Sequence, residues 1–285
     1  MDIEPGTLYL CATPIGNLED ITERVRETLG QVDLIAAEDT RNSMKLLTRF
    51  DIHVPMTSYH KFNQYDKAEE LIGRLKEGKS IALISDAGTP GISDPGEVLV
   101  KRCVEEGVKV SALPGASAAI TALILSGLPG GRFAFEGFLP REGKDRKTRI
   151  KELENEKRTI IIYEAPHRLR KTLKELFEVL GDRKIALCRE LTKKHEEVLR
   201  MGLGAALDLY SEKEPKGEYV LVVEGYSGPA GDTADSAGMG LLTIAELMQH
   251  YMDKGLSKKE AMRAVALDRG VSRRDIYREL LEKDG

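Results

Sequence analysis

A run of small polar residues, glycines and prolines between Ser85 and Gly96 is the part of the chain whose residue types point most clearly to chemistry. It carries the acids Asp86 and Asp94 among three glycines and two prolines. Glycine lets a backbone approach a ligand closely, and proline removes freedom that binding would otherwise have to quench. The run follows residues 81–84, which predict a buried parallel strand. We expect a ligand-binding loop there, because open α/β sheets bind ligands at the carboxyl ends of strands. An ordinary tight connection is the alternative.

A second motif matches a known pattern but is rejected. Residues 73–80 fit the phosphate-binding pattern G-x-x-x-x-G-K-S/T letter for letter. That pattern cradles phosphate only when a strand precedes it and a helix follows. Here residues 66–77 predict a helix, Gly78 ends it, and Ile81 begins a strand. The order is reversed, so the segment does not predict nucleotide hydrolysis.

The bulk composition describes an ordinary globular chain of 285 residues, 41% apolar and 32% charged. A net charge of −4 argues only against charge-driven, non-specific binding of nucleic acid. No apolar run approaches the roughly 20 residues that span a bilayer, and the start of the chain has no signal-peptide pattern. Cys11, Cys103 and Cys188 are scattered among apolar neighbours. We therefore expect a cytoplasmic protein with reduced core cysteines, no membrane association and no metal.

The elements that must position these residues alternate regularly up to residue 113, which predicts a parallel α/β sheet. The predicted strands are 7–12, 34–37, 81–84 and 108–113. The first predicted helix starts at Asp20 and ends at Gly30. Further helices are predicted at 41–50, capped by Thr40, at 66–77 and at 97–106. Residues 57–64 are polar and aromatic, too irregular for core.

From Ala118 the pattern restarts. Strands are expected at 133–138, 159–163, 184–188, 197–201 and 219–224, and helices at 118–125, 144–157, 168–180 and 205–210. Neighbouring strands without an intervening helix indicate a mixed sheet. We place the boundary at 114–117, which gives an N-terminal α/β domain of residues 1–115 and a C-terminal α/β domain of residues 116–226.

The amino-acid composition changes toward the end of the chain. Residues 227–240 are rich in Gly, Ser, Ala and Asp, as in a flexible linker. Thr243-x-x-Glu246 and Ser257-x-x-Glu260 match the capping box, and a weaker start follows at Ser272. Residues 241–285 thus predict a small appendage like a helix-turn-helix. Its many Lys and Arg residues form either a solvated face or an RNA-binding module that contacts phosphate.

Six segments in this order resemble a known family: residues 13–21, 37–41, 85–96, 113–118, 163–168 and 217–225. Together they resemble the tetrapyrrole methylase superfamily of S-adenosylmethionine (SAM) enzymes. They are most similar to its ribosomal RNA small subunit methyltransferase I branch, the 16S rRNA cytidine-2′-O-methyltransferases. The resemblance implies the two-domain, class III SAM methyltransferase fold, with the cofactor in the cleft between the domains and usually a homodimer. The C-terminal helices are also as expected for that branch.

The resemblance also implies which residues bind SAM. They are Pro14, Gly16, Asp86, Ala87, Gly88, Thr89, Ile92, Ser117, Ala118, Tyr163, Glu164 and Ala165. Two departures from the tetrapyrrole enzymes favour RNA as the substrate. Their Gly-x-Gly-Pro-Gly-Asp appears as residues 12–17, Ala-Thr-Pro-Ile-Gly-Asn, and their Gly-Gly-Asp-Pro as residues 87–90, Ala-Gly-Thr-Pro.

A ribose hydroxyl is a poor nucleophile until it loses its proton, so a general base would help methyl transfer. The candidates near strand ends are Glu38, Asp39, His60, Glu164 and His167. We expect Asp39 and Glu164 to be catalytic because of their positions. Each could equally cap a helix or accept hydrogen bonds from the hydroxyls of the cofactor.

Binding of 16S rRNA in the small ribosomal subunit requires cations and stacking groups around the cleft. The candidates at loops and strand ends are Arg41, Tyr59, His60, Lys61, His167, Arg168, Arg189, Lys193 and Lys194. A basic edge is expected from Lys144, Arg146, Lys147, Arg149 and Lys151. Taken singly, each of these residues could be an ordinary surface charge.

Two alternatives to an rRNA methyltransferase remain open. A methyltransferase acting on a tetrapyrrole or another small molecule would need an enclosed apolar acceptor pocket. A non-catalytic RNA-binding assembly factor would leave the glycine–proline loop without a purpose. SAM binding separates the second alternative from both enzymes.

Overall fold

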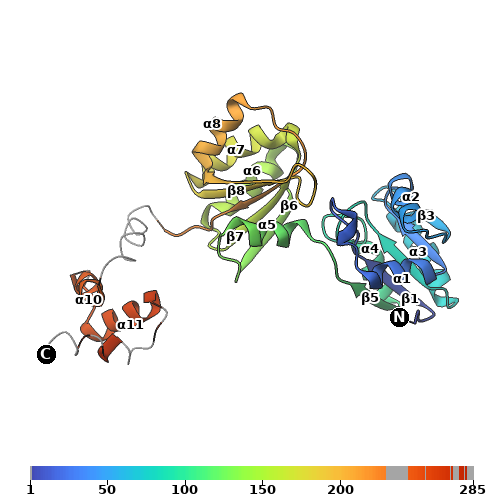
Figure 1. The fold of residues 1–285 in the computed structure, drawn as a ribbon, viewed down its shortest axis with the longest axis horizontal. Helices are drawn as coiled ribbons and strands as arrows, with labels where there is room; N and C mark the ends of the chain where they lie inside the picture. Colours follow the sequence, from blue (N-terminus) through green and yellow to red (C-terminus); the bar gives the residue numbers. More distant parts are fainter. Residues whose placement is uncertain are drawn as a thin grey trace. The chain divides into compact units, whose positions relative to one another are not determined.

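The computed structural model describes residues 2–228, 243–253, 255–269, 271, 276–278 and 280, in two compact units, Met1–Tyr226 and Ser227–Gly285. Two five-stranded sheets form the first unit (Figure 1). The predicted α/β class and the mixed second sheet are confirmed. The predicted boundary at 114–117 lies between the last strand of the first sheet and the first helix beyond it; as a domain boundary it stays a prediction.

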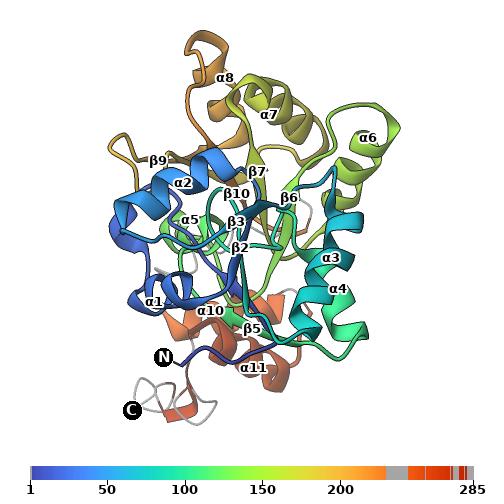
Figure 2. The ribbon, with the colours of Figure 1, turned by 90° about the vertical axis from the view of Figure 1, so that its right-hand side faces the viewer.

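The first sheet is parallel, with its strands in the order β3-β2-β4-β1-β5. Its bounds are β1 Thr7–Cys11, β2 Leu34–Ala37, β3 Met56–Ser58, β4 Ile81–Ile84 and β5 Lys109–Leu113. The helices are α1 Glu23–Gln31, α2 Thr40–Arg49, α3 Gln64–Lys76 and α4 Glu97–Glu105. Side chains from alternate strand positions pack against α1 and α2 on one face and against α3 and α4 on the other (Figure 2). This alternation follows from the two-residue period of a strand.

This topology changes direction between β1 and β4. The two strands are neighbours, yet the helix after β1 lies on one face of the sheet and the helix after β4 on the other. The carboxyl edge between β1 and β4 is therefore a switch point of the topology, the kind of position where open sheets bind ligands.

The second sheet is mixed, with its strands in the order β6-β7-β10-β8-β9. Its bounds are β6 Phe133–Phe138, β7 Thr159–Glu164, β8 Lys184–Arg189, β9 Glu197–Gly202 and β10 Tyr219–Val223. One face packs against α5 Ala118–Ser126; the other packs against α6 Gly143–Glu152, α7 Pro166–Leu180 and α8 Leu203–Glu212 (Figure 1). Only β6 and β7 pair in parallel, and β10 runs antiparallel to both of its neighbours.

Several local predictions were wrong. Asp20 lies in a short 3-10 helix, Leu18–Asp20, and α1 begins after Thr22, whose side chain accepts the N–H of Val25. Gly30 lies inside α1. Thr40 is the first residue of α2, because Asp39 caps the helix. The basic helix ends at Glu152 and continues as a 3-10 turn, Leu153–Asn155.

The second unit contains α10 Ile244–Asp253 and α11 Lys258–Arg269, which pack through Leu247, Ala261 and Val265. Both predicted capping boxes form: Thr243 with Glu246 and Ser257 with Glu260 exchange hydrogen bonds in both directions. The weaker start at Ser272 and the predicted linker beyond Gly228 lie outside the described residues.

Candidate active site

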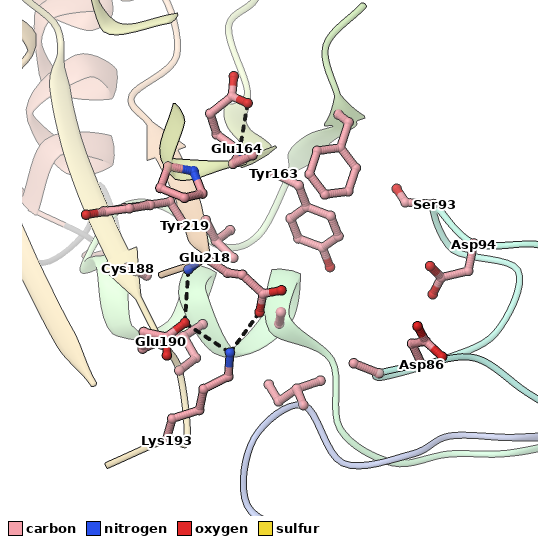
Figure 3. Close-up of a pocket in the computed structure, with 18 of the residues that line it drawn as sticks. Asp86, Ser93, Asp94, Tyr163, Glu164, Cys188, Glu190, Lys193, Glu218 and Tyr219 are labelled. Atoms are coloured by element: carbon pink, nitrogen blue, oxygen red, sulfur yellow. Dashed lines mark hydrogen bonds and ion pairs between the residues drawn. The ribbon is translucent and has the colours of Figure 1, made fainter. Parts of the chain in front are cut away.

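A cavity of about 530 Å³ lies between the carboxyl edge of the first sheet and one edge of the second. The first sheet contributes the segments after β1, β2 and β4. The second contributes the ends of β7 and β8 and the beginning of β10. The two sets of side chains face each other in Figure 3. This volume is in the usual range for a small-molecule or cofactor site.

Hydrogen bonds join the loops that follow β1 and β4 beside the cavity. Thr13 N–H donates to Gly88 O at 2.8 Å, and Gly88 N–H donates to Thr13 O at 3.0 Å. Gly88 has a φ of +80°, in the left-handed region that favours glycine. A Cβ there would lie 3.3 Å from Ile15 Cγ2. Gly88 therefore joins the loops and holds Ile15, which lines the cavity.

Gly16 lets the loop after β1 touch the second half of the unit. A Cβ on Gly16 would lie 2.5 Å from Lys193 Cγ and 2.8 Å from Leu191 O. The neighbouring Asn17 N–H donates to Thr192 Oγ1 at 3.0 Å. No side chain fits in this contact, so the predicted importance of Gly16 has a steric explanation.

The loop from Ser85 to Gly96 has unusual backbone geometry, as its composition predicted. Gly91 has a φ of +85° and Gly96 of +151°, and Ser93 has a φ of +62° although it carries a side chain. Ser93 Oγ also lies where a side chain on Gly137 would be, 2.7 Å from its ideal Cβ. The loop presents Ile92, Ser93 and Asp94 to the cavity.

Two acids on this side of the cavity, Glu38 and Asp94, are partly buried, and the exposed Asp86 is close enough to act on both. Burial raises the pKa of Asp94 to about 7, with the negative charges of Glu38 and Asp86 adding to the rise and a hydrogen bond from Ser85 opposing it. Burial also raises the pKa of Glu38, whose carboxylate accepts the backbone N–H of Asp86. A carboxyl that titrates near neutrality is suited to exchange protons.

Glu164, a predicted catalytic residue, has its carboxylate fully engaged. Its Oε1 accepts from the N–H of Ala165 at 2.9 Å and lies 3.2 Å from Arg168 Nε, and its Oε2 accepts from the hydroxyl of Thr172. The side chain is 0% exposed, and Figure 3 shows its carboxylate pointing away from the acids across the cavity. The structure therefore gives this carboxylate a structural role, which argues against its use as a base.

Asp39, the other predicted catalytic residue, caps α2. Its Oδ1 accepts the N–H of Arg41 at 2.9 Å, and its Oδ2 lies 2.8 Å from Arg41 Nη2. Hydrogen bonds from the Arg41 side chain and backbone lower the pKa of Asp39 to about 2. So weak a base is poorly matched to proton abstraction at neutral pH, and Asp39 is absent from the cavity lining.

Lys193, predicted to bind RNA, lies in the wall of the cavity. Its ammonium is 3.0 Å from Glu190 Oε1 and 2.8 Å from Glu218 Oε2 (Figure 3). The three residues join the end of β8 to the start of β10. Two carboxylate partners leave little of the charge of Lys193 for a phosphate group.

The other RNA candidates divide by their contacts. His167 is exposed and lines the cavity, Lys61 and Lys194 are exposed, and His60 is half-buried. Arg41 is exposed but bound to Asp39. Arg168 donates to Leu139 O, and Arg189 lies 3.1 Å from Glu197. Tyr59 is 0% exposed, so the prediction that its segment avoids the core was wrong for this residue.

The predicted basic edge is corrected at Arg146. This guanidinium is 1% exposed and donates to Glu175 at 2.6 Å, Thr172 at 2.7 Å and Pro140 O at 2.9 Å. Lys144, Lys147 and Lys151 are exposed as predicted, and Arg149 is 2.7 Å from Glu136. A helical charge pattern cannot distinguish a buried arginine from its exposed neighbours, because burial depends on what packs against it.

Seven predicted cofactor residues line the cavity: Asp86, Ala87, Ile92, Ala118, Tyr163, Glu164 and Ala165. Pro14, Gly16, Gly88, Thr89 and Ser117 lie in the segments beside it, and Thr89 Oγ1 donates to Ala116 O at 3.4 Å. Their role in binding SAM stays a prediction. Sequence reasoning missed Ile15, Asp94, Phe138, Glu190, Leu191, Glu218 and Val220 as lining residues. Asp94 was within reach, since it belongs to the glycine–proline loop.

The lining fits SAM in its chemistry. Ile15, Leu191 and Val220 give an apolar wall suited to an adenine ring, while Asp86 can accept hydrogen bonds from hydroxyl and ammonium groups. The hydroxyl of Tyr163 accepts the N–H of Ala119 and faces the same space. Among the described residues, no group of three or more His, Cys, Asp or Glu side chains is arranged to hold a metal ion. None of the described helices combines the length and apolar character needed to cross a membrane.

Comparison with known proteins gives one family. The family model for Tetrapyrrole (Corrin/Porphyrin) Methylases matches residues 7–207. The chain is 48% identical over 274 residues to the ribosomal RNA small subunit methyltransferase I of Halalkalibacterium halodurans, covering 96% of this chain and 94% of that protein. It is 47% identical over 220 residues to the protein of the same name from Thermotoga maritima, covering 77% of this chain and 99% of the relative.

The fold is also similar to solved structures. A diphthine synthase aligns with a TM-score of 0.59 at 15% identity, over 76% of this chain and 90% of that one. Such low identity supports the shared fold alone.

Proposed function

The chain belongs to the tetrapyrrole methylase family and, within it, to the ribosomal RNA small subunit methyltransferase I proteins, and on this premise we propose that it methylates the 2′-hydroxyl of a cytidine ribose in 16S rRNA. It is a methyltransferase, and its methyl donor is SAM. The resemblance stated from the sequence and the predicted fold class are thereby confirmed. The observation that carries the proposal is a cavity of cofactor size between two sheets, in a chain nearly half identical to proteins named for this activity.

SAM supplies an electrophilic methyl group, which passes from its sulfur to an acceptor oxygen while the sulfur keeps the electron pair of the broken bond. The residues that would hold SAM are the apolar Ile15, Ala118 and Val220, with the polar groups of Asp86 and Tyr163. The protein must align the acceptor and exclude water, and such positioning contributes roughly 7–11 kcal/mol to the lowering of the barrier.

The acidic lining supports a nucleoside entering with its phosphates outside. Glu38, Asp86 and Asp94 would repel a phosphate group but accept hydrogen bonds from a ribose. Cations for the flanking phosphates lie elsewhere, on Lys144 and Lys147 of the exposed face of α6. A tetrapyrrole carries carboxylates of its own, so this lining does not favour it as a substrate. The α10–α11 unit, with Lys258, Lys259 and Arg263, is the proposed RNA-binding appendage.

We also propose a cytoplasmic homodimer that acts without a bound metal. The exposed apolar side chains of Ile120 and Ile124, 44% and 75% exposed and one turn apart on α5, support a self-association surface. The mass of one chain is 31.6 kDa, and sedimentation should give twice this mass.

The test of the proposed function is methyl transfer from radiolabelled SAM into purified small subunits and into free 16S rRNA that lack the modification. Digestion to nucleosides and mass spectrometry should give 2′-O-methylcytidine as the labelled product. Label on a base rather than a ribose, or no label in either substrate despite saturable SAM binding, would contradict it. The second outcome would favour the small-molecule methyltransferase, whereas an absence of SAM binding would favour the non-catalytic assembly factor.

A further inference from the structure

We propose that Asp94 is the catalytic base, whose carboxylate takes the proton from the ribose hydroxyl as that oxygen is methylated. The inference rests on the proposed function and extends it, since sequence reasoning pointed to Asp39 and Glu164 instead.

Asp94 is placed in the cavity by the loop that follows β4. It is half-buried and lines the cavity beside Ser93 and Ile92. Figure 3 shows its carboxylate on the side of the first sheet, across the cavity from the hydroxyl of Tyr163. A base must reach the proton it removes, and an acceptor entering this space would lie within reach of Asp94.

The other carboxylates that line the cavity are engaged by partners. Glu164 is bound to Ala165, Arg168 and Thr172. Glu190 and Glu218 share the ammonium of Lys193.

On the first sheet, Glu38 accepts the N–H of Asp86, and Asp86 accepts from the Asn42 amide at 3.4 Å. The partner of Asp94 is the small hydroxyl of Ser85. None of these three acids forms a salt bridge with another described residue, unlike Glu164, Glu190 and Glu218, and the pKa of Asp94 is raised to about 7.

The backbone that carries Asp94 is strained in a way that serves a site. Ser93 has a φ of +62°, a conformation that residues with a side chain rarely adopt. Gly137, at the irregularity between β6 and β7, leaves room for the Ser93 hydroxyl. Strain of this kind persists where the surroundings fix one geometry, commonly at an active site. Here it fixes the direction of the next side chain, Asp94.

The charges around Asp94 make its carboxylate a stronger base than an ordinary aspartate. Glu38 after β2 and Asp86 after β4 are negative, and Tyr163 on β7 faces it from the second sheet. His60 lowers the pKa of Glu38 and so favours the negative charge that Asp94 experiences. Burial and the two acids together raise the pKa of Asp94 to about 7, so above neutral pH it is ionised and basic.

The proton balance of the step is simple. The O–H bond of the ribose breaks, and the proton moves to an Oδ atom of Asp94. The electron pair left on the oxygen forms the new bond to the methyl carbon, while the sulfur keeps the pair of the bond that breaks. Asp94 then releases the proton to water.

The first test compares Asp94→Asn with the wild type in single-turnover methylation of 16S rRNA. Asn keeps the size of the side chain and removes its basicity, so the rate should fall about 10²–10⁴-fold. SAM and RNA affinities should stay within about threefold. Asp51→Asn is the matched control, because Asp51 is exposed and also has a positive φ, at 54°; its rate should equal that of the wild type.

The second test is the pH profile. Below about pH 7 the wild-type rate should rise tenfold per pH unit and then level off, as Asp94 loses its proton. The residual rate of Asp94→Asn should lack this ionisation. Asp94→Glu keeps a titratable group, so its profile should retain the rise with a displaced midpoint. It also decides the matter should the Asn variant fail to fold.

A third readout is independent of activity. The folded pKa of Asp94 is raised from 3.8, so any stability from its protonated form is lost as pH rises through about 7. Asp94→Asn should therefore melt at a higher temperature than the wild type at pH 8, and this difference should vanish near pH 4.

The outcomes separate the two proposals. If the wild type methylates 16S rRNA and Asp94→Asn does so within threefold of its rate and with the same pH profile, the base is not Asp94. If the wild type binds SAM but methylates no ribose, the proposed function fails, and the role of Asp94 fails with it.

Discussion

Two aspartates of this protein have opposite basicity because their surroundings differ. Asp39 lies beside the Arg41 guanidinium at a helix N-terminus, and its pKa falls to about 2. Asp94 lies in a half-buried loop beside Glu38, and its pKa rises to about 7. A position after a strand could be predicted for both residues. Basicity could not be predicted, because it depends on side chains that only the folded sheet brings together.

At the residue scale, Gly16→Ala should weaken SAM binding at least tenfold. The added Cβ would lie 2.5 Å from Lys193 Cγ and 2.8 Å from Leu191 O. The backbone oxygen can move only with its loop, so the loop carrying Ile15 must move away and open the cavity. Isothermal titration calorimetry with SAM measures the loss.

The matched control is Gly30→Ala in α1, where a new Cβ meets nothing within 4 Å. It should leave SAM affinity unchanged and stabilise the helix by about 0.5 kcal/mol. Equal SAM affinity in Gly16→Ala and the wild type would mean that the Gly16 contact does not shape the site.

At the scale of elements, a buried polar network holds the end of β7. Arg146 of α6 donates to Thr172 of α7, and Thr172 donates to Glu164, the last residue of β7. Arg168 adds a contact from Glu164 to Leu139 O. This network fixes the strand end that carries Tyr163 into the cavity. Residues 163–168 therefore position the site through buried hydrogen bonds and an ion pair. The sequence motif alone did not predict these contacts.

Arg146→Met should destabilise the first unit by about 2–4 kcal/mol. The change leaves Thr172 without its donor and Glu175 without its cation, and it removes one of the two guanidinium donors to Pro140 O. This loss is smaller than that of a fully buried pair, because the Glu175 side chain is 25% exposed. Urea unfolding measures the difference.

Lys147→Met, at the exposed neighbouring position of α6, is the control and should change stability by less than about 0.5 kcal/mol. Equal effects of the two substitutions would show that the Arg146 network contributes nothing measurable.

Regular elements were the most predictable part of the fold. Apolar runs such as residues 81–84 and 219–224 became central strands because their side chains suit a sheet buried on both faces. Local capping was less predictable: Thr40 and Asp39 are both good caps, and the backbone geometry of Asp39 decided between them. Tyr59 was missed because its neighbours are polar, while its ring is buried in the core of the first sheet.

At the scale of the whole molecule, the site needs both sheets, whereas the C-terminal unit is separate. The unit ending at Tyr226 contains all of the described residues that line the cavity. Tyr226 fixes the C-terminal end of this unit: its N–H donates to Glu156 O, and its ring lies 5.3 Å from the Arg183 guanidinium. A relative named for the same activity is matched over 99% of its length by 77% of this chain. The alignment with this relative covers 220 residues, which is close to the length of the first unit, Met1–Tyr226.

A chain ending at Gly228 should bind SAM as the full chain does, within about twofold. Its RNA affinity should fall at least tenfold and depend less on salt, because phosphate contacts from Lys258, Lys259 and Arg263 are removed. Calorimetry and filter binding across a salt series measure the two. Unchanged RNA affinity would contradict an RNA-binding role for α10 and α11.

SAM should bind in the space between the two sheets, and a crystal structure of the protein with SAM would show its position. This placement predicts density for SAM between Ile15 and Val220, with Asp94 beside the open space that the methyl group faces. Density at any other place, or Asp94 turned out of the cavity, would contradict it.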